Sequence, residues 1–441
     1  MTTPIHGPHA ARRPHLVFIF SDQQHHAAWG RRDPFFATPH MDRLAADALD
    51  CTRAYCTTPL CSPSRSSLMT GRFPHQTGVI KNGIHLKGTT LAPRLQAAGY
   101  TTAYFGKWHL GGEPQAVAGW DEMQGVHDEY KAPNRPLSDA ETRDFACDFL
   151  ARHAGDEKPF ALFVSFDEPH GHYVFDPNAG YPAGHAPVPE QPDPATPLPH
   201  STEHPSRVPA LWCDSDNQGK DMQSIYGDDA TWRYQVYRKV YRDRVAAYDR
   251  SLGAVLDQLR RLGLYDDCLV IVGSDHGDMD AAQRTVFKGH YNYDAVQRVP
   301  LLLKAPAAWN ATARAYHGIV SLVDVPATLL DAAGVPADSA LPGHSLLPVL
   351  RGQAPGHGRD EAVVAYVNRN DLLTSRTLVH ADWKYVKVSD GREALIHLPT
   401  DPAESRDLAA DPAHAATLDG MRQRLRTWCR RENDTAFLPC L

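Results

Sequence analysis

Short apolar runs alternate with helical patterns along most of this chain, and that alternation is the feature that most limits its fold. Alternation of this kind is typical of an α/β domain, in which helices cover both faces of a mainly parallel sheet. The predicted buried strands are Leu16–Phe20, Thr102–Phe105, Phe160–Phe166, Leu269–Gly273 and Pro300–Lys304. The predicted helices are Met41–Ala48, Leu91–Ala98, Asp144–His153, Trp232–Leu262 and Leu322–Ala333.

Two segments depart from this rhythm. Residues 171–230 are rich in Pro, Gly, His and Asp, and a stretch of this length without regular elements is usually functional, disordered or wrapped over a site. We expect part of it to border the active site. After Gly352 the pattern changes to short strands followed by a closing helix. These are Ala362–Val367, Arg376–Val379, Trp383–Val388, Ala394–His397 and the helix Ala415–Arg430. The sequence therefore predicts a catalytic domain over residues 1–355 and a small α+β subdomain over residues 356–441.

Composition excludes some classes of function. The net charge is −7 and no basic cluster is present, so nucleic acid is not an expected partner. The first apolar run, Leu16–Phe20, is too short for a signal peptide or a membrane span. The 8 cysteines contain no CxxC pair and are typical of reduced thiols. We therefore expect a soluble, cytoplasmic protein with no membrane partner.

Polar side chains follow three of the predicted strands, where ligands bind in open α/β sheets. The three strand ends are Ser21-Asp22-Gln23, Asp167-Glu168-Pro169-His170 and Ser274-Asp275-His276-Gly277-Asp278. Oxygen ligands of this kind suit hard cations such as Ca²⁺, Mg²⁺ or Mn²⁺. An aspartate after a strand can equally cap the next helix, so a single strand end does not distinguish a metal ligand from a helix cap. Two such ends with compatible ligands favour a metal site.

The segment CSPSRSSLMTGR, residues 61–72, predicts a helix that begins near Pro63 and ends at Gly71. A helix start attracts anions, and Arg65, Lys107 and Lys288 are candidates to line an anion pocket. Cys61 is open to two interpretations. It is either a buried apolar side chain or a thiolate nucleophile activated by the helix start, as in a thiol hydrolase. Neither interpretation accounts for the metal-type strand ends.

The same segment resembles a known signature. Residues 61–72 match the sulfatase pattern C-x-P-S-R-x-x-L-x-T-G-R, and further motifs follow in the order of that family. They are Ser21-Asp22-Gln23, Thr38-Pro39-His40-Met41-Asp42, Thr77-Gly78, Gly106-Lys107-Trp108-His109-Leu110-Gly111 and Ser274-Asp275-His276-Gly277-Asp278. The chain is thereby identified as a member of the type I sulfatases, in the alkaline phosphatase superfamily. The resemblance implies a large mixed sheet flanked by helices and a small C-terminal domain on a four-stranded antiparallel sheet.

The resemblance also implies a modified residue and a metal. Cys61 would be oxidised to Cα-formylglycine by a separate maturation enzyme that reads the C-x-P-S-R context. Asp22, Asp275 and His276 would bind one divalent ion together with that residue. Gln23 stands where many members have a second Asp, and its amide oxygen can still coordinate. His276 stands where many members have Asn, which makes Mn²⁺ credible beside Ca²⁺, with Mg²⁺ a further candidate.

Finer details resemble choline sulfatases and phosphonate monoester hydrolases. These details are the Asp-Gln and Asp-His pairs, Asn82 placed 21 residues after Cys61, and Lys288 placed 12 after His276. The resemblance implies that Asn82 and Lys288 contact the sulfate or the metal. Asn82 is alternatively a turn residue, because it precedes a glycine.

The chemistry that the resemblance implies is hydrolysis of a sulfate ester or sulfamate. A hydroxyl of the hydrated aldehyde attacks sulfur, and His170 or Lys288 donates a proton to the leaving group. His109 then removes a proton from the second hydroxyl, and sulfate is released. Arg65 would hold the diol, while Lys107 and Lys288 would offset charge on the sulfate oxygens, with Lys107 and His170 also in contact with substrate.

Two other functions stay open at this point. A phosphonate monoester or phosphodiester hydrolase would use the same site, because phosphoryl and sulfuryl groups share a tetrahedral shape. A chain whose Cys61 is never oxidised would be a metal-binding homologue without activity. The expected substrate is small and sulfated, with a carbohydrate favoured by polar and aromatic residues such as His172, Tyr173, Trp212 and Tyr226. The apolar tail Phe437-Leu438-Pro439 offers a surface for self-association into a homo-oligomer.

Overall fold

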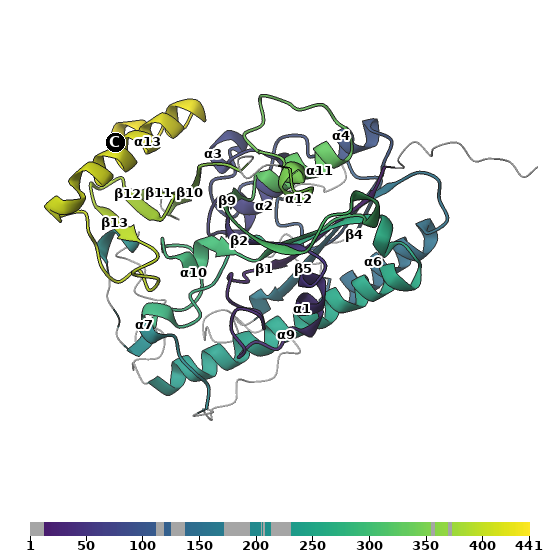
Figure 1. Ribbon diagram of the computed structural model, residues 1–441, viewed down its shortest axis with the longest axis horizontal. Helices are drawn as coiled ribbons and strands as arrows, with labels where there is room; N and C mark the ends of the chain where they lie inside the picture. Colours follow the sequence, from purple (N-terminus) through teal and green to yellow (C-terminus); the bar gives the residue numbers. More distant parts are fainter. Residues whose placement is uncertain are drawn as a thin grey trace, which may run out of the picture.

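A nine-stranded sheet forms the centre of the molecule (Figure 1). The computed structural model describes residues 13–111, 119–124, 137–171, 195–203, 205, 208–212, 231–353, 358–368 and 373–441. The strands are β1 (His15–Asp22), β2 (Leu49–Tyr55), β3 (Thr101–Gly106), β4 (Glu122–Gln124), β5 (Phe160–Pro169), β6 (Cys268–Ser274), β7 (Arg298–Val299), β8 (Leu301–Lys304) and β9 (Arg314–Ser321). Their order is β4-β3-β5-β1-β6-β8-β2-β7, with β9 paired to β2.

The sheet is mixed but mostly parallel, as the sequence predicts. Strands β4, β3, β5, β1 and β6 pair in parallel, and β2 pairs in parallel with β9. Strand β8 lies between the two groups and runs antiparallel to both β6 and β2. β1 is therefore a central strand with parallel neighbours on both sides, which places its carboxyl end beside those of β5 and β6.

Helices cover both faces of the sheet because the central strand is apolar on both sides. Leu16, Phe18 and Phe20 belong to one core, and Val17 and Ile19 belong to the other. One face is covered by α2 (Cys61–Thr70), α4 (Ala92–Ala97), α11 (Asp324–Ala332) and α12 (Leu347–Leu350). The opposite face is covered by α1 (Pro39–Ala45), α6 (Asp139–His153) and α9 (Thr231–Arg261). Successive side chains along a strand point to opposite faces of the sheet, so they pack alternately against these two helix layers.

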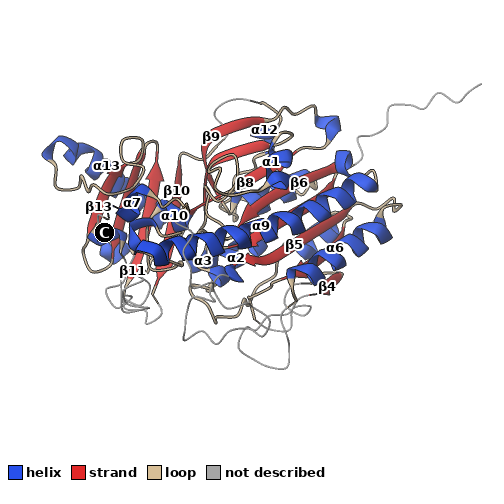
Figure 2. Cartoon of the chain, turned by 90° about the horizontal axis from the view of Figure 1, so that it is seen from below, coloured by secondary structure: helices blue, strands red, loops and turns tan. Residues whose placement is uncertain are grey.

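The longest helix, α9, runs beneath the sheet from its outer edge toward the C-terminal unit (Figure 2). The sequence predicts it to within one residue at each end. Gly263, which follows it, has a φ of 71°, a left-handed conformation that glycine adopts without strain. Further short helices are α3 (Pro74–Thr77), α7 (His200–Glu203) and α10 (Asp294–Gln297). Within the described residues of the stretch from 171 to 230, which the sequence leaves without regular elements, the structure has α7 and a 3-10 turn at Pro209–Leu211.

A second, separate sheet follows in the C-terminal part. Its four strands, β10 (Glu361–Val367), β11 (Thr374–His380), β12 (Trp383–Val388) and β13 (Glu393–His397), pair antiparallel in sequence order. Helix α13 (Ala415–Arg431) packs on it through Leu418, Met421 and Leu425. This confirms the predicted antiparallel sheet. The predicted division at residue 355 lies outside the described residues.

Buried polar contacts tie the two sheets together. Lys384 of β12 is fully buried and pairs with both Asp294 of α10, at 2.5 Å, and Glu404. Arg359 makes a two-pronged pair with Asp324 at the start of α11, with the Nε bond measuring 2.8 Å. The C-terminal sheet is therefore anchored to the large domain by charges that water does not reach.

Candidate active site

Three strand ends and one helix start meet at a single edge of the large sheet. Ser21 of β1 is in register with Ser274 of β6, so Asp22 and Asp275 lie side by side just beyond that edge. Helix α2 begins at Cys61 and ends at Thr70, and the next residue, Gly71, has a φ of 73°. Its first turn faces the two carboxylates, because Ser64 Oγ donates a hydrogen bond of 2.6 Å to the backbone oxygen of Asp275. The fold therefore delivers residue 61 to the strand ends.

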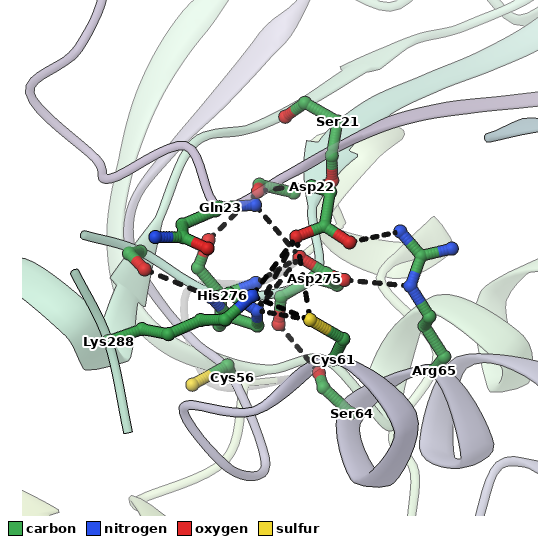
Figure 3. A network of polar contacts seen from close by, with 12 residues as sticks. Ser21, Asp22, Gln23, Cys56, Cys61, Ser64, Arg65, Asp275, His276 and Lys288 are labelled. Atoms are coloured by element: carbon green, nitrogen blue, oxygen red, sulfur yellow. Dashed lines mark hydrogen bonds and ion pairs between the residues drawn. The ribbon is translucent and has the colours of Figure 1, made fainter. Parts of the chain in front are cut away.

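Four buried side chains form a candidate metal centre (Figure 3). Ligand atoms of Asp22, Cys61, Asp275 and His276 all lie within 4.8 Å of one another. The Nδ1 of His276 lies 2.9 Å from the carbonyl oxygen of Gly277, so this nitrogen carries the proton. The other ring nitrogen, Nε2, lies 3.3 Å from the Cys61 sulfur. Two carboxylates, an imidazole nitrogen and the group at residue 61 form a donor set that fits a divalent ion.

Arg65 binds both carboxylates of this centre from the side of the helix. Its Nε donates to Asp275 Oδ2 and its Nη2 to Asp22 Oδ2, each at 2.9 Å. Its Nη1 donates at 2.7 Å to the backbone oxygen of Lys107 and to Ser165 Oγ. All three guanidinium nitrogens are thus engaged with the protein. This arrangement positions the metal-type carboxylates, whereas the resemblance implies a contact with the residue formed at 61.

Two lysines reach the same centre from opposite loops. Lys107 Nζ lies 3.0 Å from Asp22 Oδ2 and 2.8 Å from Asp167 Oδ1. Lys288 Nζ lies 2.7 Å from the Cys61 sulfur and 3.5 Å from Asp22 Oδ1. Burial opposes ionisation of Asp22, but Lys107 and Lys288 outweigh it and hold the pKa of this carboxyl well below its usual value. The lysines thus supply the positive field that an anionic substrate needs.

The same field acts on residue 61. Burial and the Asp22 carboxylate oppose ionisation of the Cys61 thiol, yet Lys288, His276 and a hydrogen bond with His109 lower its pKa well below the usual value. Burial, with Lys107 and Lys288, lowers the pKa of His170, which also forms a hydrogen bond with Cys61. His109, His170 and Lys288 therefore all contact residue 61, and the lowered pKa of His170 favours its neutral form.

Gln23 and Asn82 lie at the margins of the centre. Gln23 directs its amide nitrogen to Asp278, while its amide oxygen lies on the side of the metal-type cluster (Figure 3). Asn82 is exposed, and its Oδ1 accepts a hydrogen bond of 3.0 Å from the backbone N–H of Ser62. Asn82 therefore caps the first turn of α2, a structural role that places it next to residue 61.

Sequence reasoning missed several supporting residues. Asp167, Ser165, Asp278 and Tyr241 each contact a predicted site residue, and Tyr237 contacts Asp278. Asp167 and Asp278 stand in the strand-end motifs, so their position was a usable signal. The two tyrosines come from helix α9, far away in the chain, and no local pattern marks them. Of the predicted substrate contacts, His172, Tyr173 and Tyr226 lie outside the described residues.

The structure also describes Phe437 and Trp212, two residues with a predicted role outside the centre. Phe437, proposed as part of a tail for self-association, is buried in the core of the C-terminal unit, with Arg376 over its ring at 4.6 Å. Trp212 packs edge-on against Tyr291 at 5.1 Å between ring centres. Within the described residues, no helix combines the length and the apolar character that a membrane crossing requires.

The fold and this centre place a helix-borne residue beside a candidate metal site at the carboxyl edge of the sheet, an arrangement that fits a hydrolase. Comparison with known proteins identifies the family to which the chain belongs. The model of the sulfatase family matches residues 14–335, and that of the C-terminal part of N-sulphoglucosamine sulphohydrolase matches residues 283–431. The chain belongs to the sulfatase family and is a sulfatase-type enzyme.

Individual relatives agree with this assignment. The ulvan-active sulfatase of Formosa agariphila is 26% identical over 436 residues, covering 91% of this chain and 78% of that protein. The choline-sulfatase of Rhizobium meliloti is 27% identical over 472 residues, covering 93% of this chain and 86% of that protein. Among solved structures, a 2-O GAG sulfatase has a TM-score of 0.81 at 24% identity, with 96% of this chain and 93% of that chain covered, and so shares the fold.

Proposed function

We propose that this enzyme hydrolyses a sulfate ester, or a sulfamate, to an alcohol or amine and inorganic sulfate. One observation carries the proposal: Cys61 begins helix α2 inside a buried set of two carboxylates and one imidazole, with the ammonium of Lys288 2.7 Å from its sulfur. A positive pocket beside a metal centre suits an anionic tetrahedral group. The sulfatase family membership supports sulfate as that group.

The cofactors follow from the same residues. We assign Asp22, Asp275, His276 and residue 61 as ligands of one divalent ion, with Gln23 as a fifth. Oxygen ligands favour Ca²⁺, with Mg²⁺ a further candidate, and the His276 nitrogen makes Mn²⁺ acceptable as well. Oxidation of Cys61 to formylglycine by a maturation enzyme, together with the bound ion, would supply the attacking hydroxyl at neutral pH.

The remaining side chains have separable tasks in this proposal. Lys107 and Lys288 offset negative charge on the sulfate oxygens, and Asp167 orients Lys107 through their 2.8 Å contact. His109, in contact with residue 61, accepts the proton whose removal releases sulfate. Burial lowers the pKa of His170, which favours its neutral form, so we assign the Lys288 ammonium as the proton donor to the leaving group.

The substrate is proposed to be a small sulfated molecule, with a carbohydrate as the first class to test. The names of the relatives point to ulvan and to choline sulfate, so both kinds of compound belong in a screen. We propose residues 1–355 as the catalytic domain and residues 356–441 as the C-terminal subdomain. A cytoplasmic location and a homo-oligomeric state remain part of the proposal and await fractionation and light scattering.

The decisive experiment compares an aryl sulfate with an aryl phosphonate and a phosphodiester. The enzyme is produced together with a formylglycine-generating enzyme, and peptide mass spectrometry reads the state of residue 61. We expect formylglycine at 61 and turnover of the sulfate, with Cys61→Ala inactive but folded. Cys56→Ala is the matched control, because Cys56 is equally buried but lies outside the metal-type cluster.

Three outcomes would contradict the proposal. Preferred turnover of the phosphonate or phosphodiester would reassign the reaction to phosphoryl chemistry. Unmodified cysteine at 61 in a host that supplies the maturation enzyme would support a metal-binding homologue without activity. Full activity of Cys61→Ala would reject residue 61 as the catalytic group.

A further inference from the structure

Gln23 is held in an unusual backbone conformation at the edge of the metal-type cluster. Its φ is 74°, in the left-handed region that residues with a Cβ seldom adopt. Two hydrogen bonds hold the backbone there. The N–H donates to Asp275 Oδ1 at 3.1 Å, and the carbonyl oxygen accepts from the Tyr241 hydroxyl at 2.7 Å. The side chain of Gln23 is therefore aimed by its surroundings.

Asp278, which is fully buried, determines which end of the Gln23 amide faces the cluster. Its Oδ2 accepts from Gln23 Nε2 at 2.7 Å, and its Oδ1 accepts from the backbone N–H of Asp280 at 2.7 Å. The Tyr237 hydroxyl lies 2.9 Å and 3.0 Å from the two oxygens. That hydroxyl already accepts from the Phe287 N–H at 2.9 Å, so its own proton goes to Asp278.

Each of these three partners donates to Asp278, as a carboxylate requires. A carboxylate cannot donate to Gln23 in return, so the amide nitrogen must face Asp278 and the amide oxygen must face away from it. Figure 3 shows that oxygen on the side of His276 and Asp275. The orientation of the amide is therefore fixed by the chemistry of Asp278, and a metal ion would meet an oxygen.

We propose that Asp278 is a positioning residue that presents the Gln23 oxygen to the metal, which rests on the metal site of the proposed function. The pair also explains the amide at position 23. A carboxylate there would face the buried Asp278 carboxylate, and two like charges in contact are unfavourable. Tyr237 and Tyr241 lie four residues apart on one face of α9 and fix the two partners from the same helix.

The test exchanges the polarity of this hydrogen bond. In Asp278→Asn, an amide at 278 turns its nitrogen toward Gln23, and the Gln23 amide flips to point its own nitrogen at the metal. In Gln23→Glu, two carboxylates oppose each other. The double variant Gln23→Glu/Asp278→Asn again pairs one donor with one acceptor, now with the donor at 278 and the acceptor at 23, and the second carboxylate oxygen at 23 faces the metal. Mn²⁺ affinity of the full chain, measured by competition with a fluorescent chelator, should fall about 10- to 100-fold in each single variant and recover in the double variant.

Two further variants test whether the loss of Mn²⁺ affinity is specific to the contact between Asp278 and Gln23. Asp280→Asn is the control, because Asp280 is buried two residues away but pairs with His25 and Arg238. It should leave Mn²⁺ affinity unchanged. In a Gln23→Ala background, Asp278→Asn should have no additional effect on affinity.

The inference would be overturned by unchanged Mn²⁺ affinity in Asp278→Asn or by no recovery of affinity in the double variant. It would also be overturned if Asp278→Asn lowered Mn²⁺ affinity equally in the presence and absence of Gln23. Failure of the wild-type chain to bind Mn²⁺ would overturn it as well. Absence of sulfate ester turnover, with the affinity pattern as expected, would instead reject the proposed reaction and uphold the positioning role, because the metal measurement needs no substrate.

Discussion

Arg65 and Asp275 are joined by a hydrogen bond of 2.9 Å between Nε and Oδ2, and both side chains are buried. The same guanidinium binds Asp22 at the same distance. Buried like charges repel each other, and the positive group between them allows both carboxylates to approach one point. Arg65, from the signature segment, is thus the group that brings together the candidate ligands Asp22, at the end of β1, and Asp275, just after β6.

Arg65→Lys should therefore damage the centre although it preserves charge. A lysine has no planar fork and cannot donate to both carboxylates from one position. We expect a loss of about 3–5 kcal/mol in the free energy of unfolding, which is the range for breaking a buried ion pair. Urea unfolding followed by circular dichroism measures this.

Arg32→Lys provides the comparison, because Arg32 pairs with Asp50 at 2.6 Å in a partly exposed position. That change should cost no more than about 1 kcal/mol. Equal losses in the two variants would show that Arg65 contributes only as a charge.

Stability should fall as pH rises from about 4.5 to about 7 because of Glu404. Burial raises the pKa of this carboxyl to about 7, against the attraction of Lys384, with Asp294 raising it further. A carboxyl whose pKa is higher in the folded state than in the unfolded state contributes its full stabilisation below the unfolded pKa of 4.5. This contribution is lost as pH rises through the folded pKa. Glu404→Gln should abolish the decline, which amounts to about 3 kcal/mol at most. Unfolding free energies at several pH values test this.

Glu393→Gln is a control in which the pKa shift has the opposite sign to that of Glu404. Although burial opposes ionisation, Arg422 and Tyr385 hold the pKa of Glu393 below its usual value. Its replacement should remove stability above pH 4.5 and leave the decline toward pH 7 in place. The assignment to Glu404 is wrong if Glu404→Gln keeps the wild-type pH profile.

Lys107→Met should lower kcat/KM for an aryl sulfate by about 10²–10³, the range for loss of one preorganised electrostatic contact. The physical reason is the loss of a buried positive charge 3.0 Å from Asp22 Oδ2 and beside the proposed sulfate position. Lys304→Met is the matched control, because Lys304 is a buried lysine on β8 that contacts the backbone of Tyr265. A similar loss of kcat/KM in both variants would mean that the effect is structural.

Asn82 offers a way to separate capping from substrate binding. Asn82→Ala removes the acceptor for the Ser62 N–H and should cost about 1 kcal/mol of stability. Asn82→Asp keeps an acceptor and should preserve stability while raising KM, because it adds negative charge near the sulfate. Thermal unfolding and steady-state kinetics on both variants give the two readouts. An unchanged KM in Asn82→Asp would leave Asn82 with the capping role alone.

Much of the fold could be predicted from local pattern, and the exceptions have physical causes. Helix α9 was predicted closely because its apolar face repeats over many turns. Strand β2 was missed because Asp50 and Arg53 interrupt its apolar run. β9 is exposed at alternate positions in its first half, which hides it from a search for buried runs.

The sequence by itself determined the family: the signature segment, the strand-end aspartates and their order identify a sulfatase. Only the tertiary structure decided how those groups are used. Arg65 turned out to bridge two carboxylates, Asn82 to cap α2, and Asp278 to orient Gln23. These roles are contacts between segments as many as 255 residues apart. A motif specifies which side chains are present, but the direction of a hydrogen bond depends on what the fold brings opposite each of them.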